Sequence, residues 1–163
     1  SDICVLENLV DVRDDAICDS SGSKQVYSSA SPIGITAFRQ SVAGTDKIQF
    51  SFDVVHSGSG NVFDPASGVV SCPQDSTTRR KKEDKIDVKV NTGITQSLNC
   101  GVIGQGTGGL VIGTVTLVDG KRTVTCTQDV SGQTDLINIV DITVDFNYLD
   151  KTEKKVIVKH LIG

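Results

Sequence analysis

Apolar and polar residues alternate in several short runs along the chain, and a period of two residues is typical of β-strands. The clearest run is 47–56, whose apolar residues fall on one face: Ile48, Phe50, Phe52 and Val54. Since successive side chains of a strand point to opposite faces of its sheet, this face is expected to lie against a core. The pattern predicts a central strand that carries two aromatic rings into the interior.

The segment 110–128 contains two alternating runs separated by Asp119 and Gly120. An Asp-Gly pair favours the two-residue hairpin turn, whose central residues both have positive φ. The turn predicts a hairpin with the pairs Val118–Lys121, Leu117–Arg122, Val115–Val124 and Gly113–Cys126. Its buried face would carry Val111, Val115, Leu117, Val124 and Cys126, and its exposed face Thr114, Thr116, Thr123 and Thr125.

Further strands are predicted across most of the chain. No stretch shows a sustained 3.6-residue period, and Val, Ile, Thr, Gly and Ser dominate the composition while Met and Trp are absent. These features predict an all-β fold, an antiparallel β-sandwich over 32–163 preceded by an N-terminal strand arm and spacer over 1–31. The remaining strands are expected at 3–12, 32–38, 84–90, 98–100 and 142–148, with a turn at 149–155 and a return strand at 156–161.

The N-terminal segment 3–12 is rich in apolar residues and is separated from the next strong strand by the polar stretch 19–31. A strand set apart in this way can pack on its own sheet, or it can be donated to the open edge of a neighbouring subunit. The residues by themselves leave both arrangements open.

Net charge gives no electrostatic basis for a nucleic-acid partner. The formal net charge is -4, and the one basic run, Arg79-Arg80-Lys81-Lys82, is followed at once by Glu83 and Asp84. A short charge run of this kind usually belongs to a solvated segment, so we expect a loop here rather than a site for a polyanion or a partner.

Five cysteines cannot all pair within one chain. We expect Cys4 to pair with Cys18 and Cys100 with Cys126, which implies an oxidising, extracytoplasmic location. Cys72 is then a buried free thiol, an alternative partner for Cys100 or Cys126, or a link between molecules. The sequence begins at Ser1 and contains no apolar run of membrane-spanning length, so either a leader or anchor was removed or this is an excised soluble part.

Candidate chemistry is sparse. His56 and His160 lie in no metal-ligand spacing, and neither belongs to a recognisable catalytic motif. Gly104, Gly106 and Gly109 match GxGxxG, but a strand-forming run follows them, whereas a dinucleotide site requires a helix there. We therefore predict no enzyme activity, no cofactor, no bound metal and no small-molecule substrate.

An acidic cluster, Asp11, Asp14, Asp15 and Asp19, is a weak Ca²⁺ candidate. Its spacing fits no EF-hand loop, and turn or capping roles are expected for these carboxylates instead.

Five segments together resemble the immunoglobulin-like β-sandwich domains of surface-exposed archaeal proteins: 32–63, 84–90, 98–100, 115–126 and 142–160. Within the first, FDVVHSGSGNVF is also similar to the FxVxNxGxG pattern of CARDB-like adhesion domains, with His56 in the place of the usual Asn. The resemblance implies a pilus, thread or surface-layer component whose subunits are joined by strand exchange.

The function expected from these features is that of a structural subunit of an extracellular filament, a homopolymer joined head to tail by its N-terminal strand. The residues expected to insert into the neighbour are Ile3, Val5, Leu6, Leu9 and Val10. The filament could also contact a surface or a cell. The alternative is an adhesion or ligand-binding immunoglobulin-like module of a membrane-tethered surface protein, which predicts a monomer with 3–12 paired to its own sheet.

Overall fold

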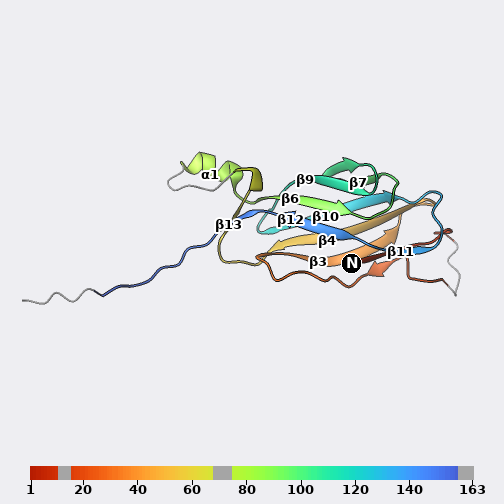
Figure 1. Ribbon diagram of the computed structural model, residues 1–163, viewed down its shortest axis with the longest axis horizontal. Helices are drawn as coiled ribbons and strands as arrows, with labels where there is room; N and C mark the ends of the chain where they lie inside the picture. The colour runs from red at the N-terminus through yellow and green to blue at the C-terminus, as the bar shows by residue number, and fades with distance from the viewer. Residues whose placement is uncertain (11–15, 68–74, 158–163) are drawn as a thin grey trace, which may run out of the picture.

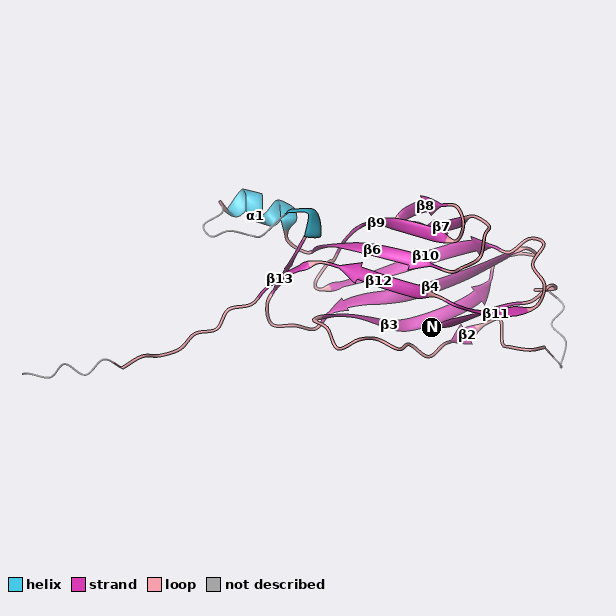
Figure 2. Cartoon of the chain, in the orientation of Figure 1, coloured by secondary structure: helices cyan, strands magenta, loops and turns pink. Residues whose placement is uncertain are grey.

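The computed structural model describes residues 1–10, 16–67 and 75–157, and these residues form antiparallel β-sheets with one short helix (Figures 1 and 2). The prediction of an all-β fold is confirmed. A single 3-10 turn, Pro65–Ser67, and helix α1, Ser76–Lys82, are the exceptions within the described part of the chain.

The largest sheet has six strands. Its order is β2 (Gly22–Ser23), β3 (Ile33–Val42), β4 (Lys47–His56), β10 (Lys121–Asp129), β7 (Leu98–Cys100) and β8 (Gly104–Gly106). All neighbours in it are antiparallel. The strands predicted at 47–56 and 98–100 have the predicted bounds.

A second sheet has three strands, in the order β12 (Asp141–Asp145), β6 (Lys85–Asn91) and β9 (Leu110–Thr116). The strands before and after β12 in the chain each form a separate two-stranded sheet. β11 (Leu136–Ile139) pairs with β1 (Asp2–Val5), and β13 (Asn147–Leu149) pairs with β5 (Asn61–Phe63). Since single residues separate β11, β12 and β13, the end of the fold is one nearly continuous strand (Figure 1).

The two larger sheets share one hydrophobic core. The Phe38 ring stacks on those of Phe50 and Phe52 within the six-stranded sheet, and their cluster also contains Ile86 and Val115 of the three-stranded sheet. The arm residues Ile3, Val5, Leu6 and Leu9 belong to the same cluster. The core therefore combines the segment 1–31 with the predicted body.

A bulge in β3 places the first of these rings. The register of β3 with β4 shifts between Thr36 and Arg39, and Ala37 has a φ of 53°. An extra residue in one strand reverses which positions face the core beyond it. Buried positions therefore change from odd numbers (Ile33) to even numbers (Phe38) within one strand.

The Asp119-Gly120 turn forms as predicted, but the hairpin beyond it does not. Val118 and Lys121 pair, and the two turn residues have φ values of 51° and 74°. Strand β9 then joins β6, whereas β10 joins β4 and β7. The predicted pairs Leu117–Arg122, Val115–Val124 and Gly113–Cys126 are therefore wrong, although each of these strands buries the predicted face.

Two further predictions need correction. The basic run expected in a loop forms most of α1, because Asp75 caps the helix by accepting hydrogen bonds from the N–H groups of Thr77 and Thr78. The C-terminal strand that was expected to return at 156–161 is not formed through Ile157: residues 150–157 pair with no strand and are exposed. Residues 158–163 lie outside the described part.

Candidate functional site

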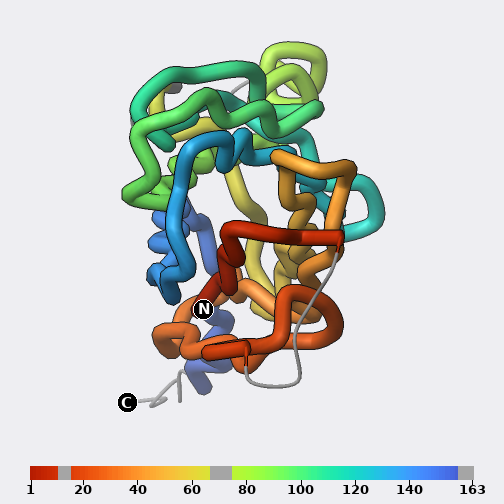
Figure 3. Tube along the Cα trace, turned by 90° about the vertical axis from the view of Figure 1, so that its right-hand side faces the viewer, coloured from red at the N-terminus to blue at the C-terminus, as the bar shows by residue number. Residues whose placement is uncertain are grey.

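Strand β1 lies within its own chain, along β11. Asp2 faces Ile139 and Val5 faces Leu136 in antiparallel register, and the red trace of the N-terminal strand runs beside the blue trace of β11 in Figure 3. Most of the residues expected to insert into a neighbour are buried here instead: Ile3, Val5, Leu6 and Leu9 are at most 5% exposed, and Val10 is 70% exposed. The described chain thus has the self-packed arrangement of this segment.

The side-chain amide of Gln40, in β3, holds the backbone of β1. The Cys4 N–H donates to Gln40 Oε1 at 2.9 Å, and Gln40 Nε2 donates to the Cys4 carbonyl at 2.5 Å. Gln40 is buried. One amide therefore satisfies both backbone polar groups of Cys4 and replaces a strand neighbour at this point.

Both predicted disulfides are present. Cys4 bonds to Cys18 with a Cα–Cα distance of 5.7 Å, and Cys100 bonds to Cys126 with a Cα–Cα distance of 3.9 Å across β7 and β10. Such bonds persist in oxidising compartments, which fits an extracellular-type environment. Cys72 lies outside the described residues.

A groove of about 390 Å³ opens beside β12. One wall is the core-facing side of the last strand, with Ile142, Val144 and Phe146, and the other wall is formed by β3 together with the segment before it, with Ile35 and Tyr27. The apolar residues of the first wall are only partly buried, although they pack against the core. We call this feature the β12 groove.

The β12 groove lies at the N-terminal end of β1. There the Val140 N–H donates to the Ser1 carbonyl at 2.7 Å, and the Ser1 ammonium donates to the Val140 carbonyl at 3.4 Å. Within the described chain β12 pairs only with β6, at the end of its sheet. Alternate N–H and C=O groups of an edge strand point away from its neighbour, so the edge of β12 can accept another strand.

Charged side chains at the β12 groove are acidic. Asp2 and Asp141 line it, and the lining contains no lysine or arginine side chain. Asp145 is also exposed at the far end of β12. The groove therefore combines an apolar interior with two acidic side chains, and the Ser1 ammonium lies beside Asp2.

Residues 150–157 leave the body after β13 and extend away from it (Figure 1). Val156 is 75% exposed and Ile157 is 79% exposed, although both are strongly apolar. We call residues 150–163 the C-terminal tail; the structure describes it through Ile157.

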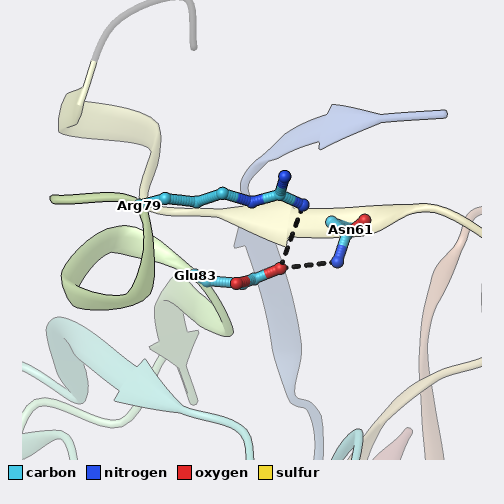
Figure 4. A network of polar contacts seen from close by, with 3 residues as sticks. All are labelled: Asn61, Arg79 and Glu83. Carbon is cyan, nitrogen blue, oxygen red and sulfur yellow. Dashed lines mark hydrogen bonds and ion pairs between the residues drawn. The ribbon is translucent and has the colours of Figure 1, made fainter. Parts of the chain in front are cut away.

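The helix α1 is tied to the body by Arg79 (Figure 4). Its guanidinium lies 3.5 Å from Glu83 Oε1, which also accepts a hydrogen bond from Asn61 Nδ2 at 2.5 Å. The guanidinium carbon of Arg79 lies 5.7 Å from the centre of the Phe63 ring. Arg79 therefore has a structural role, while Arg80 and Lys81 are exposed to solvent.

His56 ends β4 and packs edge-on against the Tyr148 ring, at 6.0 Å between ring centres. Its Nε2 atom is buried and has no hydrogen-bond partner among the described residues. Burial and the neighbouring Glu83 raise the pKa of Asp84, while nearby His56 lowers it to a smaller extent. These groups form no nucleophile-base pair, and we assign them no chemistry.

Only some of the other residues that the sequence suggested for metal, catalytic or dinucleotide sites lie in the described part of the chain. Asp19 accepts hydrogen bonds from the N–H and hydroxyl of Ser21, which lower the pKa of its carboxyl and give it a turn role. Asp11, Asp14, Asp15 and His160 lie outside the described residues, within which no three metal-binding side chains come together. The glycines of the GxGxxG match lie in β8 and the connection to β9, not at the start of a helix.

The β12 groove was not predicted from the sequence. The alternation of Ile142, Val144 and Phe146 showed a strand with one apolar face, but alternation does not show whether both edges of a strand are paired. Gln40 was missed as well, since one polar residue in a strand gives no sign of a distant backbone partner.

No helix in the described segments is long and apolar enough to cross a membrane. Comparisons with protein-family models, curated proteins and solved structures find no match for this chain.

Proposed function

We propose that this chain is a structural subunit of an extracellular filament, pilus- or thread-like, with an immunoglobulin-like β-sandwich body related to CARDB-like domains. Copies assemble head to tail by exchange of the N-terminal strand. A contact between two different surfaces of identical subunits propagates without closing, so it generates a filament. In this role the protein acts on no substrate.

The observation that carries the proposal is the position of β1. The segment 1–10 contributes Ile3, Val5, Leu6 and Leu9 to the core, and β1 within it pairs with β11 alone. Among the described residues between β1 and β3, the two-residue strand β2 is the only strand. A segment so connected can be exchanged between copies, because the same side chains then fill the same sites in the neighbour. The disulfides support an extracellular setting for such a polymer.

Exchange is tested by a cysteine pair across β1 and β11. Asp2 and Ile139 are directly opposed, and both are exposed. In a Cys72→Ser background, oxidised Asp2→Cys/Ile139→Cys protein should run as a ladder of covalent oligomers on a denaturing gel if β1 is exchanged. Monomers alone would show that β1 stays in its own chain, and the single variants control for nonspecific oxidation.

Electron microscopy of the purified full chain tests the filament itself. Filaments are expected, and removal of residues 1–12 should abolish them. Because this deletion also removes core side chains, a peptide of residues 1–12 added in trans should restore the fold, as measured by circular dichroism, without restoring the polymer. Dispersed single particles of the full chain would overturn the proposal.

An adhesion or ligand-binding module of a surface protein is the second candidate. The pairing of β1 with its own β11 favours it, since such a module needs no exchanged strand. It predicts a monomer at all concentrations in sedimentation velocity, whereas a filament subunit sediments faster as its concentration rises.

A further inference from the structure

We propose that the β12 groove binds the C-terminal tail of a second copy of this chain, as a strand added to the edge of β12. This inference rests on the proposed function only in making the contact a second joint of the same polymer; the binding itself stands on the groove and the tail.

The dimensions of the groove fit an added strand. The free edge of β12 comprises the five residues Asp141–Asp145, about 17 Å at the rise of an extended chain. A strand placed there would lie in line with β1, whose N-terminal end is beside Val140. Its inward side chains would meet Ile142 and Val144 beside them and Ile35 across the groove.

The tail supplies side chains of the required kind. The sequence from Val156 to Leu161 reads VIVKHL, which is strand-forming, and its first two residues are left three-quarters exposed or more. Adjacent exposed apolar residues in an extended segment suit a strand that is added to the sheet edge of a partner.

The charges of the tail suit the groove, and they also indicate which side chains of the tail face inward. Residues 150–159 contain four lysines against two acidic residues, while the rim of the groove carries Asp2 and Asp141. Lys155 and Lys159 must stay in solvent, so the alternating positions Val156 and Val158 face inward. Ile157 then faces outward with the lysines.

A second copy is the occupant because the tail of the same chain points elsewhere. The tail follows β13, which is fixed by its pairing with β5, and residues 150–157 run outward from that end of the body (Figure 1). An extended segment that leaves one molecule is placed to reach a groove on the next.

Binding is tested with a fluorescein-labelled peptide of residues 150–163 added to the full chain, by fluorescence anisotropy. The peptide with Val156→Ser should bind at least about tenfold more weakly, since burial of a valine side chain contributes about 1.4 kcal/mol or more. The matched peptide with Ile157→Ser should bind within about twofold of the original. No binding of the original peptide, or equal losses for both variants, would overturn the inference. The protein is unaltered throughout, so unfolding cannot mimic a result.

The site is tested by crosslinking two differently substituted copies, each with Cys72→Ser. Thr143 is exposed on β12, and Ile157 is the outward residue of the tail, so Thr143→Cys mixed with Ile157→Cys should give a disulfide-linked dimer on oxidation. Ile112→Cys, exposed on the opposite edge strand β9, replaces Thr143→Cys as the control and should give none. A chain carrying both Thr143→Cys and Ile157→Cys that forms only internal disulfides would show that the groove takes its own tail.

The two proposals fail in different ways. Filaments of the full chain without the Thr143–Ile157 crosslink would overturn the tail contact and leave the proposed function standing. The crosslink in a protein that forms only discrete dimers would support the tail contact and overturn the filament.

Discussion

Val118 and Lys121 exchange two backbone hydrogen bonds of 3.0 Å, yet the strands on either side of this pair, β9 and β10, belong to different sheets. The turn between them therefore connects the two halves of the core. It is also anchored to β4, because the His56 N–H donates to the Gly120 carbonyl at 2.8 Å.

Substitution of Gly120 should destabilise the protein through backbone conformation alone. Gly120 has a φ of 74°, and an added Cβ would meet nothing closer than the His56 carbonyl at 3.6 Å. Gly120→Ala should lower the free energy of unfolding by about 1–2 kcal/mol, the cost of a left-handed conformation for a residue with a Cβ. The control Gly101→Ala, at a glycine with open space and no positive φ, should change it by less than about 0.5 kcal/mol in urea denaturation. Equal effects would contradict this explanation.

Loss of the Gln40 amide should release β1. Gln40→Leu leaves the buried N–H and C=O of Cys4 without their partner, at a cost of about 1–3 kcal/mol. Hydrogen exchange should accelerate at Cys4 more than in the core strand β4. Gln105→Leu, at an exposed position in β8, serves as the control. Unchanged exchange at Cys4 would show that β11 alone holds β1.

The Cys100–Cys126 bond should contribute to global stability. Its cysteines are 26 residues apart, and closing a loop of this size restricts the unfolded chain by about 2–4 kcal/mol. The double variant Cys100→Ala/Cys126→Ala should therefore unfold at lower urea concentration. A Cys4→Ala/Cys18→Ala variant compared oxidised and reduced provides the control, because reduction then removes only the Cys100–Cys126 bond and keeps its side-chain volume.

Acid should remove the contribution of Asp53. The Lys121 ammonium and the Thr123 hydroxyl hydrogen-bond its carboxylate and hold its pKa below the ordinary value of 3.8. A lowered pKa in the folded state stabilises the protein above the unfolded pKa, and this contribution is lost as the pH falls through the folded pKa. Asp53→Asn should cost less than about 1 kcal/mol at pH 7, since Lys121 is half exposed, and nothing at a pH below the folded pKa.

Asp84→Asn should stabilise the protein at pH 7, in contrast to Asp53→Asn. Burial and Glu83 raise the pKa of Asp84, so its ionisation opposes folding as the pH rises above 3.8 through the folded pKa. Asn also tolerates the positive φ of 58° at this position. The variant should be more stable than the wild type at pH 7 and no more stable at low pH, as measured by thermal denaturation at both values.

Local features could be predicted from the amino-acid sequence alone: most of the strands and their apolar faces, the position of the Asp119-Gly120 turn and the two cysteine pairs. These depend on side-chain alternation, on backbone preference and on short spacings. The burial of Ile3, Val5, Leu6 and Leu9 could also be predicted, because an apolar segment is stable only when its side chains are removed from water.

What covers each strand depends on contacts between distant parts of the chain. Alternation is the same whether β9 and β10 pair with each other or face each other across a core, and the same whether β1 packs on its own β11 or on a neighbour. The bulge at Ala37, the pairing of Gln40 with Cys4 and the free edge of β12 all depend on residues distant in the chain. Partner choice is a non-local property, so a local pattern could predict the strands but not the groove between them.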